Sequence, residues 1–502
     1  MENIEALFHG FGIALTGYHI MLMVIGVLLG LVVGVLPGLG APNGVSLLLP
    51  LTFGMQPVSA IILLSSMYWG ALFGGSVTSI LFNIPGEPSS VATTFDGYPM
   101  ARDGRASTAL ATAFGSAAFG ALVGVVLITL LASWVARAAL AFGPAEYFAV
   151  YFLAFASFVG MGGTSPIKTI VSLAIGFAIA AIGIDTVSGS VRLNFGVDEL
   201  VKGVSFVVAV MGLFGIGELL LAAEEDIHAK AVKTKVDWGE VFRALAQLPR
   251  HWVALLRSAA IGCWMGITPG GPTAASFMSY GIAKRFSPRR ANFGKGEPEG
   301  IISPETADHS AGTSALLPML SLGIPGSATA AVMLGGLMIW GLNPGPMLFI
   351  EQKDFVWGLI ASMYLGNIVA LVLVLLTVPI FAALMRVPFF IIAPLIFIVC
   401  VVGAYSVSNS HLDIMLMMGF GILGYLFKKL DYPIAPLVLA IVIGDKAEDA
   451  FRQSMLISKG SLAIFIANPL VTTLVTLGFA FLLMPLFIQL AGWRVRRAAV
   501  VE

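Results

Sequence analysis

Charge is the scarcest feature of this sequence. Of its 502 residues, 27 are basic and 27 acidic, so the formal net charge is zero and charged residues make up 11% of the chain. Soluble domains carry about 25%. After Glu5 the next formal charge is Glu87, a gap far longer than the roughly 20 apolar residues that a helix needs to cross a bilayer. The scarcity of charge excludes a soluble enzyme and predicts an all-α polytopic membrane protein surrounded by the lipid bilayer.

The sequence also lacks the motifs of several functional classes. Its two cysteines, Cys263 and Cys400, lie in apolar stretches without a CxxC partner, which favours buried side chains over a disulfide or a metal site. The balanced charge gives no indication of a nucleic-acid partner. No ATP-binding P-loop, HExxH or GxSxG motif occurs. We therefore expect neither an ATP-driven transporter nor an enzyme, and no cofactor beyond a coupling ion such as sodium.

Apolar stretches recur along the whole chain. The expected spans are 12–36, 58–83, 107–135, 146–163, 167–184, 203–222, 258–283, 310–340, 355–385, 389–407, 411–427, 433–444 and 461–491. Segments near 41–54 and 272–286 are too short to cross a bilayer, so we expect half-helices or hairpins there. The pattern predicts roughly 10–12 transmembrane helices, some of them discontinuous.

Glycine and proline are abundant, with 57 and 26 residues. Proline removes a helix donor and glycine permits non-helical torsions, so apolar segments that combine the two are expected to be broken helices. Four such breaks occur along the chain. The first break is GVLPGLG (34–40) and the second contains Ile84-Pro85-Gly86. The third break is GITPGG (266–271) and the fourth contains Ile324-Pro325-Gly326.

The four breaks form two matched pairs. Pro37 and Pro269 are 232 residues apart, and Pro85 and Pro325 are 240 residues apart. Two pairs in the same order at nearly constant spacing predict an internal duplication. The predicted parts are a first transmembrane repeat at 1–222, a charged linker at 223–257, and a second repeat with a basic tail at 258–502.

The charges in the loops suggest how the repeats are oriented. The linker segment 224–257 holds 11 charges in 34 positions, and 237–256 has the periodicity of an amphipathic helix at the membrane surface. Its slight basic excess and the basic C-terminus place both in the cytoplasm by the positive-inside rule. The loop at 284–290 has four basic residues, whereas its counterpart at 51–57 has no charge. After the second pair of breaks the bias is reversed, because 97–105 carries Arg102 and Arg105 against Asp103, whereas 341–354 carries Glu351 and Asp354 against Lys353. This reversal predicts two inverted repeats.

Broken helices at membrane depth are tolerated only where their backbone faces protein or a water-filled cavity. The N-terminus of a half-helix offers N–H groups to an anion, and unwound carbonyls suit a cation. The predicted substrate site comprises Pro37, Gly38, Gly40, Asn43, Ser46, Pro85, Gly86, Ser89, Ser90, Pro269, Gly270, Gly271, Thr273, Ser276, Pro325, Gly326, Ser327 and Thr329.

Asn43 and Thr273 are also candidates for a sodium site, because their side-chain oxygens lie beside broken backbone. No Lys or Arg falls within the breaks, so an anion there would be held by backbone amides, hydroxyls and helix dipoles. Two acids lie near the second break, Glu87 and Asp96. We expect each at an interface or a helix cap rather than in an ion site.

Around these motifs the chain resembles the large membrane subunit of the tripartite tricarboxylate transporters. The resemblance rests on GVLPGLGAPNGVSLLLPLTFG (34–54), YWGALFGGSVTSILFNIPGEPSSVATTFDGYPMARDGRA (68–106), FGKGEPEGIISPETADHSAG (293–312), LPMLSLGIPGSATAAVMLGGLMIWGLNPGPMLF (317–349) and GDKAEDAFRQSMLISKGS (444–461). Two positions depart from the pattern expected of the family. Asp308-His309 stands in place of an Asn-Asn pair, and Asn468-Pro469 in place of Arg-Pro.

The resemblance implies a three-part importer of the bacterial inner membrane. In such a system a periplasmic binding protein delivers a carboxylate, a small four-span membrane subunit accompanies the large one, and a sodium or proton gradient drives uptake. The substrate would be a di- or tricarboxylate, with citrate as a candidate. A stand-alone carboxylate transporter is an open alternative, because no docking surface is evident from the sequence. A passive channel would need a continuous polar lining or rings of charge, and neither is present.

Overall fold

The computed structural model describes residues 2–36, 39–161, 165–185, 188–224, 237–268, 271–384 and 389–501. Most described residues are helical, and the only strands among them form a two-residue antiparallel ladder, in which β1 (Gly183–Ile184) pairs with β2 (Val191–Arg192). The all-α fold class expected from the sequence is confirmed.

The helices before the linker are α1 (Glu2–Ala14), α2 (Gly17–Val35), α3 (Gly40–Leu48), α4 (Pro57–Phe82), α5 (Val91–Met100), α6 (Ala106–Ala139), α7 (Pro144–Met161), α8 (Pro166–Ala180), α9 (Phe206–Val210) and α10 (Gly217–Glu224). Two π-helical turns join neighbouring helices, Ala101–Arg105 between α5 and α6, and Met211–Ile216 between α9 and α10. Gly104 has a φ of 84° within the first of these turns, so α5 and α6 meet at a kink.

The helices from the linker onward are α11 (Trp238–Gln247), α12 (Trp252–Ile267), α13 (Gly271–Phe286), α14 (Pro298–Ser314), α15 (Leu316–Leu322), α16 (Ala328–Ile339), α17 (Leu348–Glu351), α18 (Lys353–Leu384), α19 (Phe389–Ser408), α20 (His411–Lys429), α21 (Ile434–Ile457), α22 (Ile464–Ala467) and α23 (Pro469–Val501). The expected amphipathic helix at 237–256 is present in part as α11, whose Trp238 and Phe242 are exposed. This helix ends at Gln247, a 3-10 turn follows at Leu248–His251, and α12 begins at Trp252.

Several helices have the length and composition of membrane spans. Among the described residues, six are long and apolar enough: Gly17–Val35, Pro57–Phe82, Pro88–Ala139, Phe206–Glu224, Lys353–Val378 and His411–Lys429. Five shorter apolar helices accompany them. The chain is therefore a polytopic membrane protein, and the number of true crossings stays a prediction.

One expected span is wrong in detail. The segment 310–340 is not one helix, because it holds the end of α14, all of α15 and all of α16. The preceding residues 298–309, which we placed in no span, form most of α14 and are largely buried. The polar side chains of this segment lower its hydropathy, so hydropathy alone does not predict a buried helix there. The segment is nevertheless buried because these side chains pair with other buried polar groups.

The described chain divides into two compact units. Unit 1 comprises Met1–Ala139, Ser205–Ile267 and Gly271–Leu426, and unit 2 comprises Leu140–Val204, Thr268–Gly270 and Phe427–Glu502. The units cut across the two predicted repeats, because helices from both repeats pack together inside unit 1. The division of the sequence at the linker concerns an internal duplication and stays a prediction.

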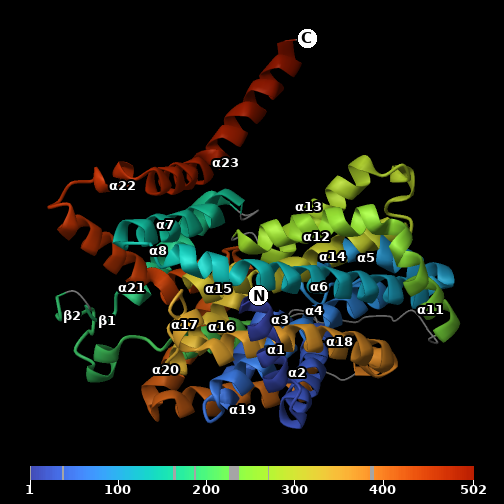
Figure 1. Cartoon of the computed structure of the whole chain (residues 1–502), viewed down its shortest axis with the longest axis horizontal. Helices are drawn as coiled ribbons and strands as arrows, with labels where there is room; N and C mark the ends of the chain where they lie inside the picture. The colour runs from blue at the N-terminus through green and yellow to red at the C-terminus, as the bar shows by residue number, and fades with distance from the viewer. Residues whose placement is uncertain are drawn as a thin grey trace. The chain divides into compact units, whose positions relative to one another are not determined.

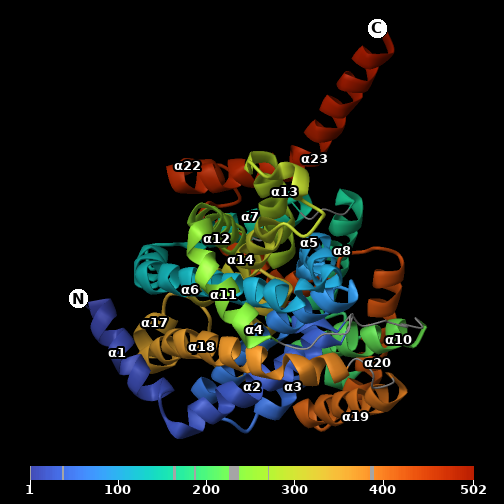
Figure 2. The same cartoon turned by 90° about the vertical axis from the view of Figure 1, so that its right-hand side faces the viewer.

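In unit 1, close contacts at glycine hold the helices together. Gly30 and Gly34 of α2 lie directly against the backbone of α4 (Figure 1). Gly262 and Gly266 of α12 lie in the same way against α14, and α13 packs beside them (Figure 2). Only a residue without a Cβ atom permits such an approach.

The breaks have matching backbone geometry in the two halves. Gly40 and Gly271 begin α3 and α13 with φ of 59° and 66°. Asn83 and Gly323 end α4 and α15 with left-handed φ of 57° and 70°. This agreement accords with a duplication, while the inverted relation of the halves stays a prediction.

In unit 2, α7, α8, α21 and α23 pack together (Figure 1), and the β1–β2 hairpin follows α8. Ion pairs fix the hairpin to α21. Arg452 donates to Asp185 at 2.7 Å, and Arg192 donates to Glu448 at 2.8 Å. Both arginines are about one-third exposed, so these pairs orient the hairpin and add little to its stability.

The glycine contacts lead to a first prediction. Replacing Gly30 with Leu forces a side chain into the backbone of α4 at Met67, so we expect a loss of about 1–3 kcal/mol or more in the free energy of unfolding. The measurement is the apparent melting temperature in detergent, followed by size-exclusion chromatography. Gly12→Leu is the matched control, because nothing lies within 4 Å of a Cβ at Gly12. Equal melting temperatures for the two variants would contradict the packing described here.

Candidate functional site

The first break joins α2 to α3, and its Pro37 and Gly38 lie outside the described residues. The N-terminal end of α3 is bonded to a carboxylate of the protein itself, because the Ala41 N–H donates to Glu87 Oε1 at 2.6 Å. Glu87 therefore acts as a cap, as expected from the sequence. A substrate carboxylate at this helix end must share it with Glu87 or displace Glu87.

Asn43 and Ser46 lie on α3, and both are buried. The Ser46 hydroxyl donates to the Asn43 carbonyl at 2.6 Å. Thr273, on α13, is exposed. The sodium site on Asn43 and Thr273 stays a prediction.

The second break is a tight, hydrogen-bonded turn. The Ser90 hydroxyl accepts from the Glu87 N–H at 3.3 Å and donates to the Glu87 carbonyl at 2.9 Å. Ser79 of α4 donates to Ser90 Oγ at 2.9 Å. Gly86 lies against the Gly34 carbonyl at the end of α2. The second break is thus packed directly on the helix that leads into the first.

The third and fourth breaks repeat this arrangement. Gly326 lies against the Gly266 carbonyl at the end of α12, as Gly86 does against Gly34. Ser327 caps α16 by accepting from the Ala330 N–H at 3.1 Å. Ser327 occupies the position after Ile-Pro-Gly that Glu87 occupies in the first half. The two halves share a backbone shape there but differ by one carboxylate.

The remaining predicted residues of this half divide into three groups. Pro269 and Gly270 lie outside the described residues. Thr329 is buried beside Ser327. Ser276 is fully buried on α13, and its hydroxyl has no hydrogen-bond partner among the described residues.

A buried acidic group lies in α14. The sequence singled out Asp308-His309 only as a departure from the family pattern, and Glu305 and the burial of all three side chains were not predicted. Glu305 and Asp308 are each 1% exposed, and His309 is fully buried. Ser76 of α4 donates to Glu305 at 2.7 Å, and Thr93 of α5 donates to it at 2.5 Å. A signal was available, since PETADH places three titratable residues between two apolar runs.

Asp308 and His309 have open hydrogen-bonding capacity. Ser89 at the second break donates to Asp308 Oδ2 at 3.2 Å, while Asp308 Oδ1 has no partner among the described residues. His309 Nδ1 lies 3.2 Å from the Glu305 carbonyl, and Nε2 has no partner there either. Across the described ranges, no Lys or Arg forms an ion pair with Glu87, Glu305 or Asp308.

Asp96, the other acid near the second break, is a structural anchor. Its Oδ1 accepts four backbone N–H groups ahead of α14, from Gly294 at 2.8 Å, Lys295 at 3.1 Å, Gly296 at 3.0 Å and Glu297 at 2.9 Å. Its Oδ2 accepts from the Tyr280 hydroxyl at 3.0 Å. The expectation of a cap at Asp96 is confirmed.

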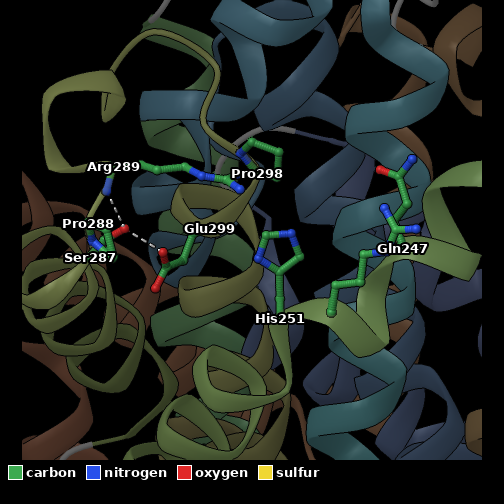
Figure 3. A pocket seen from close by; sticks show the side chains of 8 residues that line it. Gln247, His251, Ser287, Pro288, Arg289, Pro298 and Glu299 are labelled. Atoms are coloured by element: carbon green, nitrogen blue, oxygen red, sulfur yellow. Dashed lines mark hydrogen bonds between the residues drawn. The ribbon is translucent and has the colours of Figure 1, made fainter.

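A separate cavity of about 340 Å³ lies where α11 meets α12, against the connection from α13 to α14 (Figure 3). Its lining residues are Gln247, Arg250, His251, Ser287, Pro288, Arg289, Pro298 and Glu299. Glu299 accepts from Ser287 at 2.6 Å and from Arg257 at 3.0 Å. Burial, together with the charge of Arg289, lowers the pKa of His251 below its usual range. The imidazole is therefore largely neutral at pH 7, and in the lining Glu299 is already paired, as is Arg289, which donates to Glu297 at 3.3 Å.

Paired broken helices within a polytopic helical protein are the arrangement found in secondary transporters. The profile of the tripartite tricarboxylate transporter TctA family matches residues 20–439. The chain belongs to this family, and the resemblance noted from its motifs is confirmed. It is therefore a large membrane subunit of the tripartite tricarboxylate transporter type.

Two relatives come from Agrobacterium vitis. One, described as the uncharacterized 52.8 kDa protein in the TAR-I ttuC' 3' region, is 36% identical over 485 residues, which is 96% of this chain and 95% of the relative. The other, described as an uncharacterized protein in the TAR-II ttuC' 3' region, is 34% identical over 226 residues, 45% of this chain and 93% of the relative. No solved structure matches the chain significantly.

The anchor at Asp96 gives a second prediction. Asp96→Ala leaves four buried or half-buried N–H groups without an acceptor, so we expect a loss of stability of about 3 kcal/mol or more and poor membrane yield. The measurement is the apparent melting temperature in detergent. The exposed Asp103 in the adjoining turn supplies the control Asp103→Ala. A similar melting temperature for both variants would show that Asp96 does not organise the start of α14.

Proposed function

We propose that the chain forms the membrane pathway of a tripartite secondary importer for a di- or tricarboxylate, with citrate as the first candidate. The observation that carries the proposal is the pairing of breaks: Gly86 lies on Gly34, and Gly326 lies on Gly266. Each pair places a half-helix start beside a second broken segment. Family membership supports the same function.

The proposed substrate site uses the helix starts and hydroxyl groups at these breaks. Backbone N–H groups and the positive ends of helix dipoles attract carboxylates without any fixed cation. Hydroxyls at Ser89, Ser90, Ser327 and Thr329 are close to the helix starts and buried. Their burial fits a site closed to bulk water, where each hydrogen bond to a charged group counts for more.

Cation coupling follows from the charge balance of this region. The described breaks contain Glu87 but no Lys or Arg. An incoming polyanion meets a buried carboxylate, so a cation bound together with the substrate would lower the repulsion. Sodium and protons are both candidates for that cation.

The remaining parts of the proposed system are extrinsic to this chain. A periplasmic binding protein would deliver the carboxylate, and a small four-span subunit would accompany α1–α23 in the inner membrane. The linker and the C-terminus would lie in the cytoplasm. A stand-alone carboxylate transporter is the second candidate, and the two differ in their need for the binding protein.

A third prediction tests the function itself. Cells expressing the chain with its small subunit and binding protein should accumulate [14C]citrate, and this uptake should stop when ionophores collapse both sodium and proton gradients. Omitting the binding protein should abolish uptake at low citrate concentration. Uptake that survives this omission would favour the stand-alone transporter. Uptake that survives loss of both gradients would contradict a gradient-driven importer.

A fourth prediction tests the first break. Asn43→Ala removes a buried amide from α3, so we expect uptake to fall about tenfold, the effect of one lost hydrogen bond to a charged group. Uptake is measured at equal amounts of protein in the membrane. Asn292→Ala is the matched control, because Asn292 is exposed in the connection before α14. Unchanged uptake in Asn43→Ala would remove Asn43 from the site.

A further inference from the structure

We propose that Asp308 is the proton-binding group of this transporter, with Glu305, His309, Glu87 and Tyr68 as its immediate surroundings. This inference rests on the proposed function and names the coupling ion and the residue that carries it. In each cycle an O–H bond would form at Asp308 Oδ1 with a proton from one aqueous side. The same bond would break when the proton leaves to the other side.

The first step in the argument is the absence of a compensating cation. Glu87, Glu305 and Asp308 are 6%, 1% and 1% exposed, and in the part of the chain that the structure describes no Lys or Arg pairs with them. His309 Nδ1 lies 3.9 Å from Asp308 and 4.0 Å from Glu305, so the imidazole compensates these carboxylates only when it is itself protonated. An ionised carboxylate costs several kcal/mol when it is taken from water into a protein interior. Neighbouring carboxylates that are ionised together repel each other as well. This group therefore calls for a bound cation, the smallest of which is a proton.

The hydrogen bonds indicate which carboxyl group takes the proton. Both oxygens of Glu305 accept from Ser76, at 2.8 and 2.7 Å, and Oε1 also accepts from Thr93. These donors stabilise Glu305 as an anion. Asp308 has one long bond from Ser89 and an open Oδ1. Its anion is the least stabilised of the group, so it is the natural proton acceptor.

Unpartnered polar atoms around Asp308 are a second, independent observation. The Tyr68 hydroxyl of α4 is 1% exposed and has no hydrogen-bond partner among the described residues, yet it interacts electrostatically with Asp308 and Glu87. His309 Nε2, fully buried beside Asp308, also lacks a partner there. A buried polar group of this kind calls for a partner, which a proton, an ion or a water molecule can supply. The titratable groups facing Asp308 are Glu305 and His309 from its own helix, Tyr68 from α4, and Glu87 from the second break.

The geometry favours a proton over a metal ion. Among the described residues, no three His, Cys, Asp or Glu side chains converge in a way that would hold a metal. The hydroxyls of Ser76, Thr93 and Ser89 all donate to carboxylates. Sodium ligation would require several oxygens to turn toward one point, whereas a proton needs only Asp308 Oδ1.

The position of Asp308 explains how a proton could be coupled to transport. Asp308 lies on α14, and its one bonded partner, Ser89, lies at the second break. The Tyr68 hydroxyl lies close to Ser327 and Thr329 at the fourth break, outside hydrogen-bonding geometry, and interacts electrostatically with Asp308. A proton on Asp308 weakens the hydrogen bond that Asp308 accepts from Ser89, and it changes the electrostatic potential at the Tyr68 hydroxyl. Both changes occur at segments of the proposed substrate site.

The test uses the complete tripartite system in proteoliposomes, with [14C]citrate as the probe and pyranine as an internal pH indicator. A gradient of about one pH unit supports about tenfold citrate accumulation per coupled proton. We expect D308N to lose this accumulation and the accompanying proton uptake, while citrate counterflow, which needs no net proton movement, continues. The matched control is D354N, because Asp354 is an exposed acid on α18.

The outcomes are distinct. Accumulation driven by a pH gradient in D308N, with the same proton uptake as the unchanged protein, would overturn the proposal. Accumulation driven by sodium alone and lost in D308N would also overturn it, because the group would then bind sodium. Loss of citrate counterflow in the unchanged protein would instead count against the proposed function.

A measurement on the unchanged protein covers the case in which D308N does not fold. Dicyclohexylcarbodiimide adds to protonated carboxyl groups in apolar surroundings, forming a stable N-acylurea. We expect this adduct on Asp308, located by fragmentation mass spectrometry of the 298–312 segment, and we expect its yield to fall as pH rises. Labelling confined to Glu305, or no labelling of the segment in transport-competent protein, would overturn the assignment.

Discussion

The architecture depends on backbone-to-backbone contact at glycine. Lipid tails are as apolar as leucine, so helices in a bilayer gain little from hiding apolar surface and rely on close packing instead. In this protein Gly30 and Gly34 bring α2 onto α4, and Gly262 and Gly266 bring α12 onto α14. The carbonyls of Gly34 and Gly266 then receive Gly86 and Gly326. The same contacts that hold the helices together therefore also position the breaks.

A second constraint is the treatment of buried charge. The protein stabilises its interior acids with hydroxyl and amide donors, as with Ser76 and Thr93 on Glu305 and Ala41 on Glu87. Arginine or lysine partners would neutralise these acids permanently. Hydroxyl donors leave each carboxyl group free to change its charge state, as the proton exchange proposed at Asp308 requires.

Much of this organisation was predictable from the sequence. Long uncharged stretches indicated a polytopic membrane protein, Gly-Pro segments located the breaks, and matched spacing paired them. The positive φ at Gly40 and Gly271 supports the expected loss of helical geometry at the breaks. Family motifs around residues 34–54 and 317–349 identified the transporter class.

Other features depend on tertiary contacts that no local pattern encodes. The burial of Glu305 and Asp308 follows from the packing of α14 against α4 and α5, which are more than 200 residues away in the chain. From the sequence alone, a polar helix of low hydropathy resembles a surface loop, because the buried groups that hydrogen-bond to it lie elsewhere in the chain. The hydrogen bond from the Ala41 N–H to the Glu87 carboxylate, which joins the first two breaks, was not predictable for the same reason.

The difference between Glu87 and Ser327 has a consequence for the energy of the transport cycle. Two halves of identical shape and charge would make opposite-facing conformations equal in energy. If the halves are inverted repeats that exchange roles, a carboxylate in one half and a neutral hydroxyl in the other make the two opposite-facing conformations unequal in energy. The residue after a shared Ile-Pro-Gly turn would then contribute to a preferred resting conformation.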